Sequence, residues 1–231
     1  YQKFQIILDK GSGCYIWDSS GKKYLDLMGG YGVSLLGHSN KTIVQAITNQ
    51  ANKLISCHGS FYNAERANAV LNINKITPKN LDNIYLCNSG AEAVEAALKL
   101  CKKHSKNKII SMSGSYHGKT IGSLSLTWNP KYKKSFQPLL DNVDFIPFGD
   151  ADSLSKIDDN TAAVFLEVIQ GENGVKFASV EYFNKLQEQC DKHNVLLVVD
   201  EIQTGLGRTG KMWAHEHYGL KPDILCIGKG L

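Results

Sequence analysis

Two residues of this 231-residue chain stand where apolar runs end and could do chemistry together. Asp200 closes the run VLLVVD, and Lys229 follows DILCIG between two glycines. Apolar surroundings lower the pKa of a lysine, which makes Lys229 a candidate nucleophile toward a carbonyl group. A carboxylate at the position of Asp200 suits a cationic ring nitrogen. A surface lysine and a solvated Asp at the end of a strand are the simpler alternatives for each residue taken alone.

The turn Ser89-Gly90-Ala91 is a candidate phosphate seat, because the segment after it is typical of a helix. Small residues let a phosphate approach the unpaired N–H groups at the positive end of the helix dipole, and the Ser89 hydroxyl can add a hydrogen bond. An ordinary serine N-cap is the alternative.

These groups together match the needs of pyridoxal phosphate (PLP). The cofactor offers an aldehyde to Lys229, a pyridinium nitrogen to Asp200 and a phosphate to the helix, and Tyr116 can cover its ring face.

The glycines Gly205, Gly207 and Gly210 have the G-x-G-x-x-G spacing of a dinucleotide site. Such a site needs its glycines directly after a strand and at the start of a helix. Here DEIQT intervenes, KMWAHEHYG is not a long apolar-faced helix, and Asp200 would repel a pyrophosphate. We therefore interpret GLGRTG as a rigid turn with Arg208 in a structural ion pair. A nucleotide-binding protein that uses this turn is the alternative from another class.

Four other polar residues receive a structural interpretation. His215 and His217 are two positions apart and would point to opposite faces of a strand, so no metal site is expected there. Glu167 and Glu201 follow apolar runs, and a structural hydrogen bond explains either about as well as a role at a ligand.

The composition indicates an ordinary globular enzyme. The net charge of +4 is spread along the chain without an arginine-rich block, which disfavours nucleic-acid binding. No apolar run has the ~18 residues of a membrane span, and the first residues lack the layout of a signal peptide. The six cysteines form no C-x-x-C pair and are expected to be reduced thiols, so a cytoplasmic location is predicted.

The elements that position these residues follow from the apolar periodicity. Residues 1–31 predict short antiparallel strands, and Asn40 to Leu54 predict an amphipathic helix capped by Asn40. Beyond them we expect strands at 83–87, 108–112, 143–147, 162–168, 195–199 and 223–227, and helices at 91–104 and 180–193. This alternation predicts an α/β fold, a mostly parallel sheet flanked by helices, in which ligands bind at the carboxyl ends of the strands.

Five motifs in order carry a family resemblance: NSGAEAVEAALKL, SYHGKT, FLEVIQGENGV, VVDEIQTGLGRTGKMWAHEHYGLKPDIL and GKGL. They resemble the class III PLP-dependent aminotransferases of fold type I, and among them the acetylornithine and ornithine aminotransferases. The resemblance implies a homodimer that transfers an amino group from an ω-amino donor, N-acetylornithine or ornithine, to 2-oxoglutarate in arginine biosynthesis. The alternatives on the same scaffold are another ω-amino acid aminotransferase, an aminomutase and a decarboxylase.

The resemblance also implies roles around the cofactor. Lys229 would hold PLP as a Schiff base and shuttle a proton, and Asp200 would keep the ring nitrogen protonated. Gln203 would hydrogen-bond near the ring hydroxyl. Tyr116 would stack on the ring. His117 stands beside Tyr116 and is a candidate for contact with the cofactor region, but a hydrogen-bonded loop histidine is the alternative that we favour for it.

The remaining roles concern the phosphate and the substrate. Ser89, Gly90 and Ala91 would seat the phosphate. Lys119 replaces an arginine that relatives offer to the substrate α-carboxylate, so the charge is kept and the bidentate fork is lost. Glu172 matches a glutamate near the substrate pocket that gates a charged arginine in relatives, and a solvated loop glutamate is the alternative.

The domain prediction also depends on the resemblance. We expect an N-terminal segment over residues 1–55 and a PLP-binding large domain over residues 56–231. Relatives continue past the residue that matches Lys229, so we expect the large domain to be incomplete and the C-terminal domain to be lacking.

Overall fold

The computed structural model describes residues 3–103 and 106–231. Its contacts divide the chain into two compact units, one up to Lys75 and one from Ile76 to Lys229. The helix Ala64–Asn74 therefore belongs to the first unit, although the sequence-based boundary lies before it, at residue 55.

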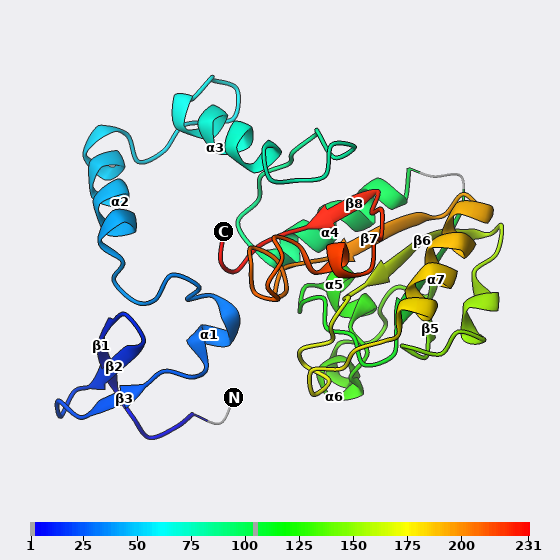
Figure 1. Cartoon of the computed structure of the whole chain (residues 1–231), viewed down its shortest axis with the longest axis horizontal. Coiled ribbons are helices and arrows are strands. Elements are labelled where there is room, and N and C mark those ends of the chain that lie inside the picture. Colours follow the sequence, from blue (N-terminus) through cyan, green and yellow to red (C-terminus); the bar gives the residue numbers. More distant parts are fainter. Residues whose placement is uncertain (1–2, 104–105) are drawn as a thin grey trace. The chain divides into compact units, whose positions relative to one another are not determined.

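The first unit begins with a small antiparallel sheet of order β1-β2-β3, as predicted for residues 1–31. Tyr1 and Gln2 lie outside the described residues. The elements of this unit are β1 (Leu8–Ser12), β2 (Tyr15–Asp18), β3 (Lys23–Leu25), α1 (Gly29–Gly32), α2 (Lys41–Lys53) and α3 (Ala64–Asn74) (Figure 1).

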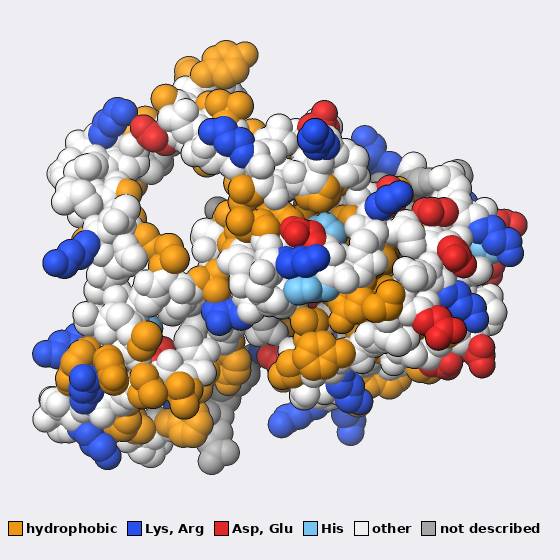
Figure 2. All heavy atoms as spheres, viewed as in Figure 1, with side chains coloured by type: hydrophobic (Ala, Val, Ile, Leu, Met, Phe, Trp, Pro, Cys, Tyr) orange, Lys and Arg blue, Asp and Glu red, His pale blue; other side chains and the backbone are white. Residues whose placement is uncertain are grey.

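Helix α2 begins where the sequence predicts. The Asn40 side chain accepts hydrogen bonds from the backbone N–H groups of Thr42 and Ile43, at 3.0 and 3.4 Å. The apolar face of α2 stays open, since Ile47 is 63% exposed, and apolar side chains also gather on the surface over β1–β3 (Figure 2). Among the described residues of this unit, Ile73 is the only buried apolar side chain.

The second unit is built on a parallel sheet of order β5-β4-β6-β7-β8. Its strands are β4 (Lys108–Met112), β5 (Val143–Ile146), β6 (Thr161–Leu166), β7 (Leu196–Asp200) and β8 (Ile224–Cys226). Its helices are α4 (Gly90–Cys101), α5 (Ile121–Leu126), α6 (Pro130–Lys133) and α7 (Val180–Lys192), with short 3-10 turns at Lys134–Phe136, Ser153–Lys156 and Ala214–His217. None of the helices in the described part of the chain has the length and apolar character of a membrane span.

The strands of this sheet are apolar on both faces, because helices cover both. Ile109 and Val198 point into a core that includes Val94 and Leu98 of α4. Their neighbours Ile110 and Val199 belong to a second core, with Tyr182, Phe183 and Leu186 of α7. Successive side chains of a strand point to opposite faces, so a buried parallel strand reads as a continuous apolar run. The predicted α/β sheet flanked by helices is confirmed.

One predicted strand is wrong. Residues 83–87 form no strand, and Tyr85 is 75% exposed. The residue pattern there suits a strand, but a strand needs a neighbour that supplies hydrogen-bond partners, and this segment pairs with no described strand. The predicted helix at 91–104 is α4, which ends at Cys101, and His104 lies outside the described residues.

Candidate active site

Asp200 and Lys229 come to the same edge of the sheet because β7 and β8 are parallel neighbours. Asp200 pairs in register with Cys226, whose carbonyl accepts the Glu201 N–H at 2.8 Å. Lys229 lies in the turn that follows β8 and has a φ of 49°. This left-handed conformation is uncommon for a residue with a side chain and marks a constrained position.

The Asp200 carboxylate is buried and held at both oxygens. Its Oδ2 lies 2.7 Å from Nδ1 of His117, and its Oδ1 accepts the Ile202 N–H at 3.0 Å. Burial opposes the charged form of His117, but the hydrogen bond to Asp200 and the charges of Asp200 and Glu167 outweigh it and raise the pKa of the imidazole. The other ring nitrogen, Nε2, is buried without a hydrogen-bond partner among the described residues.

Glu167 belongs to this cluster, which sequence reasoning left open. It follows β6, is 6% exposed, and its Oε2 accepts the backbone N–H of Tyr116 at 2.8 Å. Burial raises the pKa of Glu167 to about 7, against the positive charge of His117, and the negative charge of Asp200 adds to the rise. The only signal in the sequence was a glutamate directly behind an apolar run.

The start of helix α4 lies against the segments that carry Asp200 and Lys229. A Cβ atom placed on Gly90 would come within 2.9 Å of Ile202, and one on Gly228 would lie 3.6 Å from the Cα of Gly90. A Cβ on Gly118 would lie 3.0 Å from the Cβ of Ala91. The glycines therefore permit Ile202, Gly228 and Gly118 to lie close to the start of α4, at the positive end of its dipole.

Ser89 is the N-cap of α4. Its Oγ accepts the Glu92 N–H at 3.2 Å, while Glu92 Oε2 accepts the Asn88 N–H at 2.6 Å. Ser89 is thus a serine N-cap, which the sequence analysis gave as the alternative to a phosphate seat. The hydroxyl proton of Ser89 can still be donated to an anion.

Tyr116 and Lys119 form an aromatic and cationic group next to this cluster. The Tyr116 ring meets the Tyr132 ring edge-on, with centroids 5.8 Å apart. The Lys119 ammonium lies 5.0 Å from the Tyr132 centroid and 5.8 Å from that of Tyr116. Lys119 itself is exposed, and the faces of the two rings stabilise its charge.

Gln203 and Glu172 lie on two loops that meet. Gly171, next to Glu172, abuts the Gln203 side chain. Burial lowers the pKa of Lys229, and the charges of Asp200, Glu167 and Glu172 oppose this shift. Among the described residues, the predicted cofactor set is therefore brought to one edge of the sheet, with Glu172 on an exposed loop beside it.

The turn after Gln203 is held by a buried glutamate. Glu201 Oε1 accepts the backbone N–H of His215 at 2.8 Å and lies 3.1 Å from its Nδ1, and Thr204 donates to Oε2. His215 and His217 lie in a 3-10 helix, so the strand assumed for them is wrong. The ion pair predicted for Arg208 is also wrong, since no described residue pairs with its exposed side chain.

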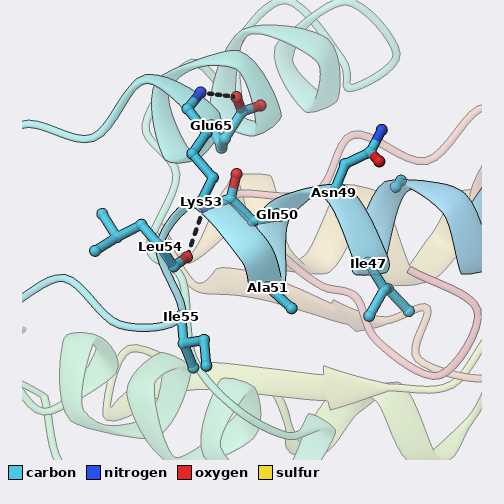
Figure 3. A pocket seen from close by; sticks show the side chains of 9 residues that line it. Ile47, Asn49, Gln50, Ala51, Lys53, Leu54, Ile55 and Glu65 are labelled. Carbon is cyan, nitrogen blue, oxygen red and sulfur yellow. Dashed lines mark hydrogen bonds and ion pairs between the residues drawn. The ribbon is translucent and has the colours of Figure 1, made fainter.

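A separate hollow of about 690 Å³ lies within the first unit (Figure 3). It is lined by residues of α2, by the segment directly after α2 and by Glu65 of α3, whose carboxylate pairs with Lys53. None of the residues expected at a cofactor lines it, so it is not the candidate site. The described residues contain no group of three or more His, Cys, Asp or Glu that could hold a metal ion.

Comparison with known proteins defines the class. The family model described as Aminotransferase class-III matches residues 1–231. The chain therefore belongs to the class III aminotransferases, and the enzymes of this family depend on PLP.

Individual relatives refine this similarity. The chain is 42% identical to an acetylornithine aminotransferase of Methanopyrus kandleri, over all of this chain and 60% of the relative. It is 47% identical to a [LysW]-aminoadipate semialdehyde/glutamate semialdehyde transaminase of Sulfurisphaera tokodaii, over 98% of this chain and 59% of the relative. The ornithine aminotransferase of Toxoplasma gondii superposes with a TM-score of 0.91 at 33% identity, over 99% of this chain and 56% of that one. The chain thus spans about 60% of the length of the curated relatives.

The residues present fit PLP. His117 Nε2 is buried and has no hydrogen-bond partner among the described residues. The same imidazole bonds Asp200 through Nδ1, so this polar atom without a partner lies beside the carboxylate expected at the ring nitrogen. The close approach at Gly90 and Gly228 leaves the α4 dipole end near the segments of Asp200 and Lys229. A carboxylate, a lysine amine and a helix N-terminus are the three kinds of group that the ring nitrogen, aldehyde and phosphate require.

Proposed function

We propose that the full-length protein is a PLP-dependent aminotransferase. It would move an amino group from an ω-amino donor, N-acetylornithine or ornithine, to 2-oxoglutarate in arginine biosynthesis. The observation that carries this proposal is the buried Asp200–His117 pair, at the strand end beside Lys229. The name of the Methanopyrus kandleri relative supports the choice of donor.

Bound PLP would supply an aldehyde that combines with amines and a ring that accepts the electrons released at the substrate carbon. Asp200 would hold the ring nitrogen, and His117, through its 2.7 Å hydrogen bond, would fix the direction of that carboxylate. The negative charge of the buried carboxylate favours the protonated form of a ring nitrogen next to it. Asp200 would thereby favour the electron-accepting form of the ring.

Lys229 would be the nucleophile and the proton carrier. Because burial lowers the pKa of Lys229, a larger share of its amine is neutral than for a surface lysine. A neutral amine can attack a carbonyl carbon and can then take a proton from the substrate carbon and return it.

The other residues would bind and orient. Ser89, Gly90 and Ala91 would hold the phosphate, Tyr116 would cover the ring face, and Gln203 would contact the ring hydroxyl. On the substrate side, Lys119 would bind the α-carboxylate of the donor. Glu172 would have the gating role of the matching glutamate in relatives. As in the family, a homodimer is the expected assembly.

A second candidate is a transaminase of the [LysW]-aminoadipate semialdehyde type. Relatives with that name reach 46 and 47% identity, above the 42% of the Methanopyrus kandleri relative. Lys119 in place of an arginine at the α-carboxylate position also leaves the donor open. Values of kcat/KM for N-acetylornithine, ornithine and a [LysW]-linked donor, measured side by side, separate the two candidates.

The chemistry itself is tested by borohydride reduction of the PLP-loaded full-length protein, followed by peptide mapping. We expect a yellow protein that bleaches on reduction and carries the label on Lys229. A label on another lysine, or a colourless protein that instead binds NAD or ATP, would overturn the proposal and favour the nucleotide-binding alternative at Gly205–Gly210.

A further inference from the structure

Gly171 lies against the end of the Gln203 side chain. A Cβ atom placed on Gly171 would fall 1.9 Å from Oε1 of Gln203 and 2.9 Å from its Cδ. Atoms do not approach so closely, so any side chain at position 171 must displace something. The φ of Gly171 is outside the left-handed range, so a side chain at position 171 would meet the end of the Gln203 side chain and would not strain the backbone.

The backbone of Gly171 is fixed by its neighbour. Gln170 is fully buried and exchanges two backbone hydrogen bonds with Lys176, at 3.0 and 3.1 Å. Its side-chain Nε2 donates to the carbonyl of Ser113 at 3.0 Å, and its Oε1 accepts from Asn173 at 2.9 Å. The loop is therefore closed at its base and tied to the end of β4, so Gly171 cannot retreat from Gln203.

The backbone of Gln203 is fixed as well. The Ile202 N–H donates to Asp200 Oδ1 at 3.0 Å, and the Gly205 N–H donates to the carbonyl of Glu201 at 2.9 Å. The buried Glu201 carboxylate anchors the same turn from inside. Since both backbones are held, the carboxamide at the end of the flexible Gln203 side chain is the group that has to move.

We propose that Gly171 is a positioning residue for Gln203. The missing side chain at 171 leaves the space that the Gln203 carboxamide occupies, and a larger residue moves this amide away from the cofactor ring. The proposal rests on the proposed function, in which Gln203 contacts the ring hydroxyl of PLP. It also couples the loop of Glu172 to the loop of Asp200 through one van der Waals contact.

A double-mutant cycle in the full-length protein tests this coupling. The apo forms of the wild type, Gly171→Ala, Gln203→Ala and the double variant are titrated with PLP, and the absorption spectrum of each loaded form is recorded. Loss of one hydrogen bond is expected to raise the Kd for PLP about 10-fold in each single variant. The double variant is expected to show the same ~10-fold rise and not ~100-fold, because both changes remove one interaction. The absorption spectra of the two PLP-loaded single variants should also differ from that of the wild type in the same way.

Gly59→Ala is the matched control. A Cβ there meets no atom of the described residues within 4 Å, and the φ of Gly59 is outside the left-handed range. Its Kd and spectrum should equal those of the wild type.

The outcomes separate this inference from the proposed function. A Gly171→Ala variant that binds PLP like the wild type, or a ~100-fold rise in the double variant, overturns the coupling alone, provided that the wild type is labelled at Lys229. If Gly171→Ala does not fold, the shorter side chain of Gln203→Ala should restore folding, and failure to do so overturns the proposal. A wild type that binds no PLP overturns both.

Discussion

The buried carboxyl of Glu167 makes a quantitative prediction about stability and pH. Burial raises the pKa of Glu167 from 4.5 to about 7 in the folded protein. The folded state therefore holds this proton more tightly than the unfolded state. Its contribution to stability is complete below pH 4.5 and is lost as the pH rises through about 7.

The substitution Glu167→Gln removes this dependence. In the wild type the Glu167 carboxyl accepts a hydrogen bond from the Tyr116 N–H, and the oxygen of the neutral amide can accept the same bond. A difference of 7 − 4.5 = 2.5 pKa units corresponds to about 3 kcal/mol between the ionised and the protonated carboxyl. The variant and the wild type should be equally stable near pH 4.5, and the variant should be the more stable by up to about 3 kcal/mol above pH 8.

Thermal unfolding of the apo protein at pH 5 and pH 8 measures this difference. At ~2–4 °C for each kcal/mol, the midpoint of Glu167→Gln should exceed that of the wild type by roughly 6–12 °C at pH 8 and by much less at pH 5. Glu172→Gln is the matched control, because Glu172 lies on the neighbouring exposed loop. Equal midpoints of Glu167→Gln and the wild type at both pH values would refute the reasoning, since the carboxyl would then be solvated or paired in the folded state.

Three further changes probe the site. Asp200→Asn keeps the shape of the side chain and removes its charge, so kcat should fall by roughly 100-fold or more while the circular dichroism spectrum is retained; full activity would exclude the role of Asp200. Ser89→Ala should cost about 1 kcal/mol in urea unfolding and Ser89→Gly only a few tenths, and a Ser89→Ala variant as stable as the wild type would show that the N-cap bond does not stabilise the protein. Lys119→Arg restores a bidentate fork and should lower KM for N-acetylornithine roughly 10-fold, because it adds a charge-assisted bond, and an unchanged KM would place the α-carboxylate elsewhere.

The sequence by itself determined the class of fold and the set of candidate residues. The strands at 108–112, 143–147, 162–168, 195–199 and 223–227 are all present within a residue or two, because parallel strands buried on both faces are continuous apolar runs. Asp200 and Lys229 could be placed at one edge, because parallel strands bring their carboxyl ends together. The strand predicted at 83–87 is not formed, since the local residue pattern carries no information about whether a partner strand lies beside the segment.

Only the tertiary structure decided which side chains touch. His117 and Asp200 are separated by 83 positions and Glu167 and Tyr116 by 51, and no local periodicity connects residues at such distances. The pKa of Glu167 depends on this same enclosure, because it is the loss of water around a carboxyl that raises it. Gly171 shows the same limit of the sequence. In the sequence it is one glycine in a loop, and only the tertiary structure places the Gln203 side chain where a side chain of residue 171 would lie.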